Sequence, residues 1–281
     1  MEFCPAILAK TESEFREKVD RVRHLGLPLH VDVMDGIFVP QMTWADPTLV
    51  MQIADDLPVE AHLMVHDPEH AAVVWLAAGA KRVWIHAEST DRVPMILRSP
   101  PNQAERLGVV LNPETPISRV IPIIDKVTAI IVIGVTPGKS GQEFQEIALE
   151  KVYHLKELRP HLWIKIDGGV NVDNIAKIAE AGTDSVATAS SLTNHPNPSA
   201  GLAEMRQRIS KPGEKPEPDK PPSIPPKGGR PEIPTDEPSA LDVVPAEVGT
   251  PAIESKAEQP EDKKEEPSTL PNEQTDEERQ L

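Results

Sequence analysis

Short apolar runs alternate with longer segments of helical period along the first 210 residues, and this alternation restricts the fold more than any other feature of the sequence. Such runs are typical of buried strands in a parallel sheet, and the segments between them are long enough to be crossover helices. The predicted strands lie at residues 3–8, 29–33, 59–64, 82–86, 108–111, 129–133, 163–166 and 184–188. Because eight successive βα units close more readily into a barrel than into an open sheet, we predict an α/β fold, a (β/α)8 TIM barrel, over residues 1–210.

Two helices are predicted most clearly, at residues 12–25 and 147–158, because apolar side chains recur there at helical spacing. Two further helix starts are predicted at Asp67-Pro68-Glu69 and at Asn171-Val172-Asp173. Asp and Asn side chains accept hydrogen bonds from the free N–H groups of a first helical turn, so both are suited to cap a helix.

Residues 211–281 have a different composition from the rest of the chain. They contain no Phe, Tyr or Trp, and they hold 15 of the 31 prolines together with 18 acidic and 9 basic side chains. So little apolar surface cannot offset the conformational entropy that ordering would cost. We therefore predict a disordered, Pro-rich acidic tail, whose segments of mixed charge identify no partner.

Charge and composition also restrict the partners. The formal net charge of −16 argues against nucleic acid, and no run approaches the roughly 18 apolar residues of a membrane span. Nothing at the N-terminus resembles a signal sequence, and the single cysteine, Cys4, excludes an intramolecular disulfide. We expect a cytoplasmic protein without a nucleic-acid or membrane partner, and a homo-oligomer is compatible with the sequence.

Polar side chains gather where the predicted strands end. His30 and Asp32 are two residues apart in the second strand and share a face, His62 lies in the third strand, and Asp167 follows the seventh. Singly, each could be a core or turn residue, but four buried polar groups without a shared partner would cost stability. Two imidazoles and two carboxylates form a ligand set for one divalent metal ion, Zn²⁺, Fe²⁺, Mn²⁺ or Co²⁺.

Several longer segments resemble the ribulose-phosphate 3-epimerase family. They are His30-Val31-Asp32-Val33-Met34-Asp35-Gly36-Ile37-Phe38-Val39-Pro40, His62-Leu63-Met64-Val65 with Asp67-Pro68-Glu69, His86-Ala87-Glu88, Gly108-Val109-Val110-Leu111-Asn112-Pro113, and Asp167-Gly168-Gly169-Val170-Asn171. They follow the family's order and spacing from Cys4 to about Ile209, and the tail has no counterpart there.

The resemblance implies a metal-dependent isomerase that epimerises carbon 3 of a ketose phosphate. His30, Asp32, His62 and Asp167 would bind the metal, and Asp32 and Asp167 would also be the catalytic acid/base pair on opposite faces of the substrate. One carboxylate removes the proton next to the ketone and the other returns a proton from the far side, while the metal stabilises an enediolate. The expected reaction converts D-ribulose 5-phosphate to D-xylulose 5-phosphate, in the pentose phosphate pathway.

The resemblance also implies contacts with a sugar phosphate. The residues expected to bind substrate are His62, Met34, Met64, Gly138, Lys139, Ser140, Gly141, Asp167, Gly168, Gly169, Ala189 and Ser190. The two methionines match residues that pack over the intermediate in the family, although ordinary core filling would explain them equally well. The glycines would allow backbone amides to approach the phosphate closely.

Four substrate-contacting positions depart from the family pattern. Ala6 replaces a serine of the first strand, and Ile133 replaces a third pocket methionine. Lys139 lies in the loop Thr136-Pro137-Gly138-Lys139-Ser140-Gly141-Gln142, where the family usually has Asn-Pro-Gly-Phe-Gly-Gly-Gln, and Ala189 replaces the glycine of a Gly-Ser pair. None of the four is a predicted metal ligand. We therefore expect the catalytic chemistry to be retained, whereas these positions leave more than one sugar phosphate as the candidate substrate.

Three hypotheses follow. The first is an epimerase of D-ribulose 5-phosphate. The second is the same chemistry on a related ketose phosphate such as a hexulose 6-phosphate. The third is a catalytically silent barrel that presents its tail to a partner, although a degenerate enzyme would be expected to lose metal ligands first.

Overall fold

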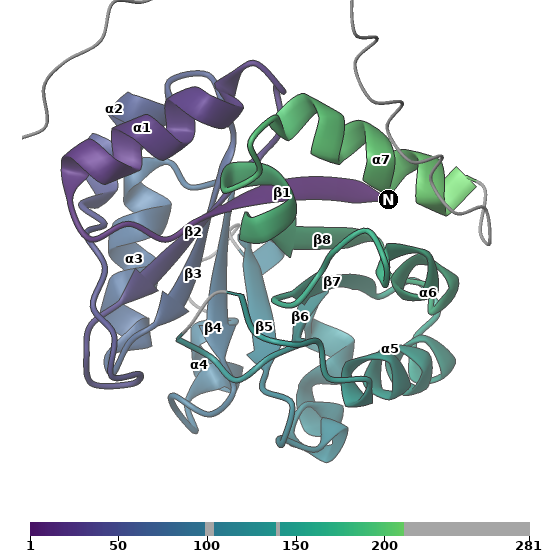
Figure 1. Cartoon of the computed structure of the whole chain (residues 1–281). Coiled ribbons are helices and arrows are strands. Elements are labelled where there is room, and N and C mark those ends of the chain that lie inside the picture. The colour runs from purple at the N-terminus through teal and green to yellow at the C-terminus, as the bar shows by residue number, and fades with distance from the viewer. Residues whose placement is uncertain (99–103, 139–140, 211–281) are drawn as a thin grey trace, which may run out of the picture. The chain divides into compact units, whose positions relative to one another are not determined.

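The structure is a computed structural model that describes residues 1–98, 104–138 and 141–210. Its described residues form eight parallel strands that close into a barrel in sequence order (Figure 1). The strands are β1 (Glu2–Ile7), β2 (Leu29–Met34), β3 (Val59–Met64), β4 (Arg82–His86), β5 (Leu107–Leu111), β6 (Ala129–Ile133), β7 (Trp163–Asp167) and β8 (Ser185–Thr188). Pairing of β1 with β8 closes the ring, so the predicted TIM barrel is confirmed.

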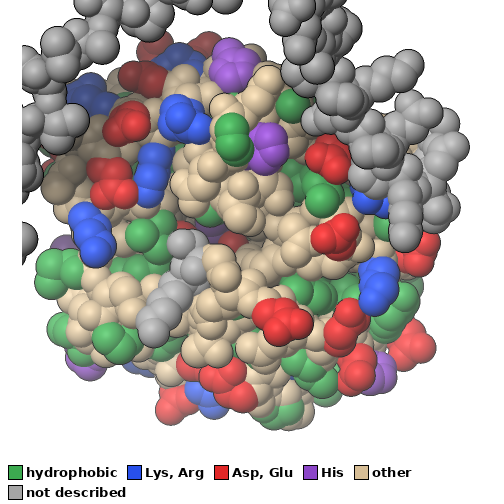
Figure 2. Space-filling model, viewed as in Figure 1, with side chains coloured by type: hydrophobic (Ala, Val, Ile, Leu, Met, Phe, Trp, Pro, Cys, Tyr) green, Lys and Arg blue, Asp and Glu red, His purple; other side chains and the backbone are tan. Residues whose placement is uncertain are grey.

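Helices cover the outside of the barrel (Figure 1). They are α1 (Glu12–Arg23), α2 (Pro47–Ala54), α3 (Pro68–Ala78), α4 (Val93–Ile96), α5 (Ile147–Leu158), α6 (Ile175–Glu180) and α7 (Pro198–Ser210), with the short helical segments η1 (Ala104–Arg106), η2 (Ile117–Arg119), η3 (Ile121–Lys126) and η4 (Ala189–Thr193). No helix within the described residues is long and apolar enough to cross a membrane. Acidic and basic side chains are interspersed over the face in Figure 2, as is usual for a solvated surface.

Local sequence explains several helix boundaries. Thr11 caps α1 by accepting a hydrogen bond from the N–H of Glu14, and α3 starts as predicted because Asp67 accepts from the N–H of His70. The helix predicted to reach residue 25 ends at Arg23, because the chain turns at Gly26, whose φ of 61° favours glycine.

The helix start predicted at Asn171 lies one turn ahead of α6, which begins at Ile175. The Asn171 side chain accepts hydrogen bonds from the N–H groups of Asp173 and Asn174, as a capping residue does, and the Asn171 carbonyl accepts from the N–H of Ile175. Asn174 in turn donates to the carbonyl of Gly169. The asparagines therefore shape this first turn and join it to the loop that follows β7.

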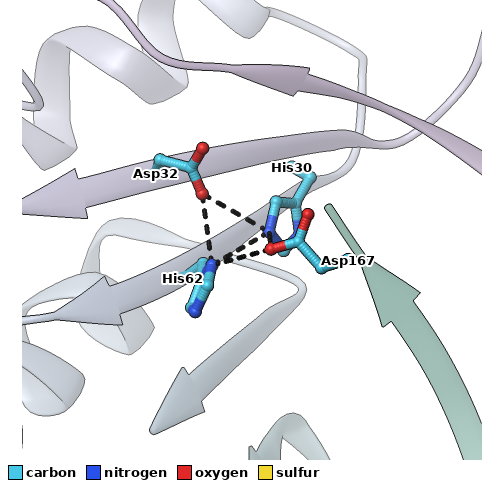
Figure 3. A group of neighbouring side chains, drawn as sticks. All are labelled: His30, Asp32, His62 and Asp167. Atoms are coloured by element: carbon cyan, nitrogen blue, oxygen red, sulfur yellow. Dashed lines mark hydrogen bonds and ion pairs between the residues drawn. The ribbon is translucent and has the colours of Figure 1, made fainter. Parts of the chain in front are cut away.

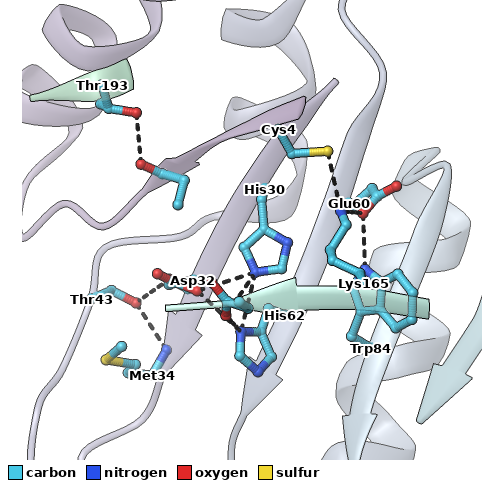
Figure 4. Close-up of polar contacts among 12 residues, drawn as sticks. Cys4, His30, Asp32, Met34, Thr43, Glu60, His62, Trp84, Lys165 and Thr193 are labelled. Atoms are coloured by element: carbon cyan, nitrogen blue, oxygen red, sulfur yellow. Dashed lines mark hydrogen bonds and ion pairs between the residues drawn. The ribbon is translucent and has the colours of Figure 1, made fainter. Parts of the chain in front are cut away.

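A buried polar network crosses the barrel interior one layer below its mouth (Figure 4). Lys165 forms an ion pair with Glu60, and its ammonium lies 3.1 Å from the Cys4 sulfur. The Trp84 indole donates a 3.0 Å hydrogen bond to the same Glu60 carboxylate. Because Trp84 fills the space beside Gly108, a Cβ there would come within 2.2 Å of the ring. The sequence analysis did not identify this network.

The Glu60–Lys165 pair makes stability depend on pH. Burial would raise the pKa of Glu60, but Lys165 outweighs burial and lowers the pKa from 4.5 to about 2. A lowered carboxylate pKa contributes stability that is present above pH 4.5 and is lost as the pH falls toward 2.

We expect Glu60→Gln to lower the free energy of unfolding at pH 7 by about 3 to 5 kcal/mol, because Lys165 would be buried without its counter-charge. The variant should also lose part of the pH dependence between pH 4.5 and 2. Denaturant unfolding across that range measures both effects. Equal stability of the two proteins at pH 7 would contradict this account of the pair.

Candidate active site

His30, Asp32, His62 and Asp167 converge at the mouth of the barrel (Figure 3). His30 and Asp32 come from β2, His62 from the neighbouring β3, and Asp167 from the end of β7. Each offers one ligand atom, and these atoms all lie within 4.8 Å of one another. The structure thus brings together the four residues that the sequence predicted as metal ligands.

The distances within this cluster are short. Nδ1 of His62 lies 3.1 Å from an Asp32 oxygen and 3.2 Å from an Asp167 oxygen. Nε2 of His30 lies 3.6 Å and 3.4 Å from the same two oxygens, and 3.2 Å from Nδ1 of His62. The histidines are buried, whereas the carboxylates of Asp32 and Asp167 are 13% and 14% exposed and line a pocket.

The two carboxylates require a positive charge between them. Burial would lower the pKa of His62, but Asp167 and Asp32 outweigh burial and raise it to about 9. Burial would likewise raise the pKa of Asp167, yet His30 and His62 lower it well below its usual range. A protonated His62 therefore supplies this charge near neutral pH, and a divalent cation would supply it more strongly.

The cluster could bind one divalent metal ion. Two imidazole nitrogens and two carboxylate oxygens suit Zn²⁺, Fe²⁺, Mn²⁺ or Co²⁺, and the four ligand atoms lie within 4.8 Å of one another. A cation that displaces the Nδ1 proton of His62 would be attracted by all four atoms. The residues present therefore fit a metal site.

Hydrogen bonds fix the loop that follows β2. The Thr43 hydroxyl donates to the carbonyl of Asp32 and accepts from the N–H of Met34, so it holds the end of the strand (Figure 4). The Asp35 carboxylate accepts from the N–H groups of Ile37, Phe38 and His66, and so ties this loop to the one after β3. The sequence analysis gave Thr43 and Asp35 no role of their own.

A pocket of about 620 Å³, open solvent at its mouth included, lies beside the cluster. It is lined by Ala6, Leu8, Asp32, Met34, His62, Met64, Ile133, Pro137, Gly138, Gly141, Asp167, Gly168, Gly169, Ala187, Thr188, Ala189 and Ser190. Every predicted substrate-binding residue within the described part of the chain is among them, whereas Lys139 and Ser140 lie outside the described residues. Leu8, Pro137, Ala187 and Thr188 had not been predicted.

One wall of this pocket is apolar. Met34 and Met64 are 4% and 2% exposed and cluster with Val39, Leu8 and Phe38. A wall of this kind excludes water from the carboxylates and strengthens electrostatic interactions beside it.

Another part of the pocket lining is glycine backbone. Gly168 and Gly169 have φ angles of 89° and 72°, and a Cβ would come within 2.5 Å of Val135 at the first and 2.8 Å of Phe144 at the second. Only glycine fits this close packing of the loops after β6 and β7.

Residues 2–193 match the model of the Ribulose-phosphate 3 epimerase family. The chain belongs to the ribulose-phosphate 3-epimerase family. The resemblance seen in the sequence is thereby confirmed, and so is the class of enzyme, an isomerase that acts on carbohydrates and their derivatives.

Named relatives agree with this assignment, and a solved structure of another enzyme shares the fold. The chain is 34% identical to the ribulose-phosphate 3-epimerase of Mycobacterium leprae over 64% of its own length and 83% of that protein, and 29% identical to that of Bacillus subtilis over 72% and 97%. The 3-hexulose-6-phosphate synthase of Salmonella typhimurium has the same fold, with a TM-score of 0.57 at 17% identity over 75% of this chain and 99% of the other.

Metal binding should release a proton from His62. Since the pKa of His62 is about 9 without a metal, Nδ1 carries a proton at pH 7 that a cation must displace. We expect Zn²⁺ addition to metal-free protein at pH 7 to release about one proton per site, and the affinity to rise with pH up to about 9.

Calorimetry in buffers with different ionisation enthalpies counts the released protons. The variant His62→Gln, which retains a polar side chain but has no titrating ring, is the control and should release none from this position. Zinc binding to the original protein without proton release would contradict the assigned protonation of His62.

Proposed function

We propose that the chain is a metal-dependent epimerase that interconverts D-ribulose 5-phosphate and D-xylulose 5-phosphate. The observation that carries this proposal is the convergence of His30, Asp32, His62 and Asp167, with ligand atoms within 4.8 Å, in a member of this enzyme family. Relatives named ribulose-phosphate 3-epimerase support the pentulose substrate.

Asp32 and Asp167 are the proposed acid/base pair. They extend from β2 and β7, which are not adjacent strands of the barrel (Figure 3), and both partly exposed carboxylates line the pocket. Inversion at carbon 3 requires one group to remove a proton from one face and another to return a proton to the opposite face. Two carboxylates that reach the pocket from separate strands satisfy this requirement.

The remaining residues position the substrate. His30 and His62 complete the proposed metal site with the two carboxylates, and a divalent cation bound there would polarise the ketone and stabilise the negative charge that develops on proton removal. Met34 and Met64 would cover the reacting carbons with an apolar surface.

The phosphate is proposed to lie against the glycine-rich wall. Gly138, Gly141, Gly168 and Gly169 all line the pocket in backbone conformations with positive φ. Ala189 and Ser190 line it at the start of η4, and Lys139 and Ser140, outside the described residues, stay part of the proposed phosphate loop.

A second candidate is the same chemistry on a different ketose phosphate. Ala6 and Ile133 line the pocket, where the family pattern has a serine and a methionine. Loss of a hydroxyl and a change of apolar shape act on substrate recognition, while the four proposed metal ligands are retained. A hexulose 6-phosphate is the substrate to compare. The silent barrel is the weaker alternative, because the proposed catalytic residues are assembled in one place.

The proposed partner is a small-molecule sugar phosphate, in the cytoplasm. Neither nucleic acid nor a membrane is part of the proposal, and a homo-oligomer stays a prediction. The disordered character of residues 211–281 also stays a prediction, because they lie outside the described part of the chain.

Hydrogen exchange at carbon 3 tests the proposed reaction directly. We expect metal-loaded protein in deuterated buffer to exchange this hydrogen of D-ribulose 5-phosphate and to form D-xylulose 5-phosphate. Asp32→Asn should lower the rate at least about 100-fold, because it removes an acid/base group and a metal ligand. Folded, metal-loaded protein that exchanges only the hexulose 6-phosphate would establish the second candidate instead.

Removal of the tail should leave catalysis unchanged. The residues proposed for chemistry all precede Ser190, and α7 ends at Ser210. We expect a chain truncated after Ser210 to have the same kcat/KM as the full chain. A truncated protein that folds but does not turn over would assign the tail a catalytic role and favour a tail-dependent function.

A further inference from the structure

His86 and Glu88 extend a row of hydrogen bonds from His62, behind the metal-ligand cluster. The proposed function assigns no role to the motif that contains them. Nε2 of His62 lies 2.8 Å from Nε2 of His86, and Nδ1 of His86 lies 3.2 Å from Oε2 of Glu88. His86 ends β4 and is fully buried. This row of hydrogen bonds therefore starts at the ring nitrogen of His62 that faces away from the cluster.

The direction of these hydrogen bonds follows from the Glu88 carboxylate, the group furthest from the cluster. Oε1 of Glu88 accepts from the backbone N–H of Asn112 at 2.9 Å, and Thr115 donates to the same carboxylate. An ionised carboxylate can only accept, so the contact with Oε2 requires a proton on Nδ1 of His86. A second proton on His86 would place a cation in a fully buried ring.

His86 therefore accepts at Nε2, and His62 must donate from its own Nε2. Once a metal ion displaces the Nδ1 proton, the neutral His62 ring keeps its remaining proton on Nε2, and its Nδ1 lone pair points to the side of the ring where Asp32 and Asp167 oxygens lie at 3.1 and 3.2 Å. This is the nitrogen that the cluster offers to a metal ion. The alternative tautomer would place a proton where the metal has to bind.

Ring packing holds His62 and His86 in this hydrogen-bonded arrangement. The His62 and His86 rings stack with centroids 5.0 Å apart, and the Phe38 ring lies 4.8 Å from His86 on centroids. In contrast, Nδ1 of His30 is buried without a hydrogen-bond partner among the described residues. Of the two histidine ligands, His62 alone has its outer nitrogen hydrogen-bonded within the described part of the chain.

We propose that His86 and Glu88 are positioning residues that keep the proton of His62 on Nε2 and thereby reserve its Nδ1 for the metal ion. This inference rests on the metal site of the proposed function. It does not depend on the sugar that the enzyme epimerises. It also gives a role to the His86-Ala87-Glu88 motif and to the Asn112 backbone that anchors it.

The substitution Glu88→Gln should reverse the direction of the hydrogen bonds that join Glu88, His86 and His62. The Asn112 N–H can only donate, so the amide oxygen of the glutamine faces Asn112 and its NH₂ group faces Nδ1 of His86. His86 must then carry its proton on Nε2 and donate to His62, which moves the His62 proton to Nδ1. We expect the Zn²⁺ affinity of the variant to fall about 10- to 100-fold.

Glu69→Gln is the matched control. Glu69 is a half-buried glutamate at the start of α3 that pairs with Arg92 and is not one of the four clustered ligands, so the same chemical change there should leave Zn²⁺ affinity unaltered. Titration with Zn²⁺ against a competing chelator measures all three proteins. Equal affinity of Glu88→Gln and the original protein would overturn the proposal.

A second measurement does not require any variant to fold. Two-bond ¹⁵N–¹H NMR correlations of the original metal-free protein at pH 7 should show His86 protonated on Nδ1. A proton on Nε2 of His86 in the original protein would overturn the proposal. If the original protein binds Zn²⁺ and Glu88→Gln binds it with the expected lower affinity, the positioning role is supported even in a protein inactive on pentulose phosphate. If the original protein does not bind Zn²⁺, the metal site and this inference are both overturned.

Discussion

Closure of the barrel by the β1–β8 pairing is the constraint on which the site depends. Four residue pairs, from Glu2 with Ser185 to Pro5 with Thr188, join the first strand to the last. The Thr193 hydroxyl reinforces the seam by donating to the carbonyl of Ala6 (Figure 4). Closure brings the ends of β2 and β7 to one pocket, and no local interaction along the chain could achieve this.

Charge balance then determines what this pocket can do. Asp32 and Asp167 are held close together in a largely buried place, where a cation between them stabilises both ionised carboxylates. In the proposed reaction, these two carboxylates also transfer the protons at carbon 3. One layer below, the Glu60–Lys165 pair is balanced internally and needs no ligand. The barrel thus contains one ionic cluster that is complete and another that a metal would complete.

The departures from the family pattern and three of the four proposed metal ligands share one pocket. Ala6 and Ile133 line it together with Asp32, His62 and Asp167, whereas His86 and Glu88 lie behind His62. Under the proposed function, Ala6 and Ile133 act on which sugar fits, while the hydrogen bonds from His62 to His86 and Glu88 act on the proposed metal site.

The order of the strands, their boundaries to within one residue, and the four polar residues at the barrel mouth are predictable from the sequence, because periodicity two and periodicity 3.6 are local properties of the chain. The face shared by His30 and Asp32 was predictable for the same reason. The Cys4–Lys165–Glu60 network and the direction of the hydrogen bonds from His62 to His86 and Glu88 follow from the tertiary structure. These depend on contacts between segments distant in the sequence, whose distances and hydrogen-bond partners are set by barrel closure and strand register.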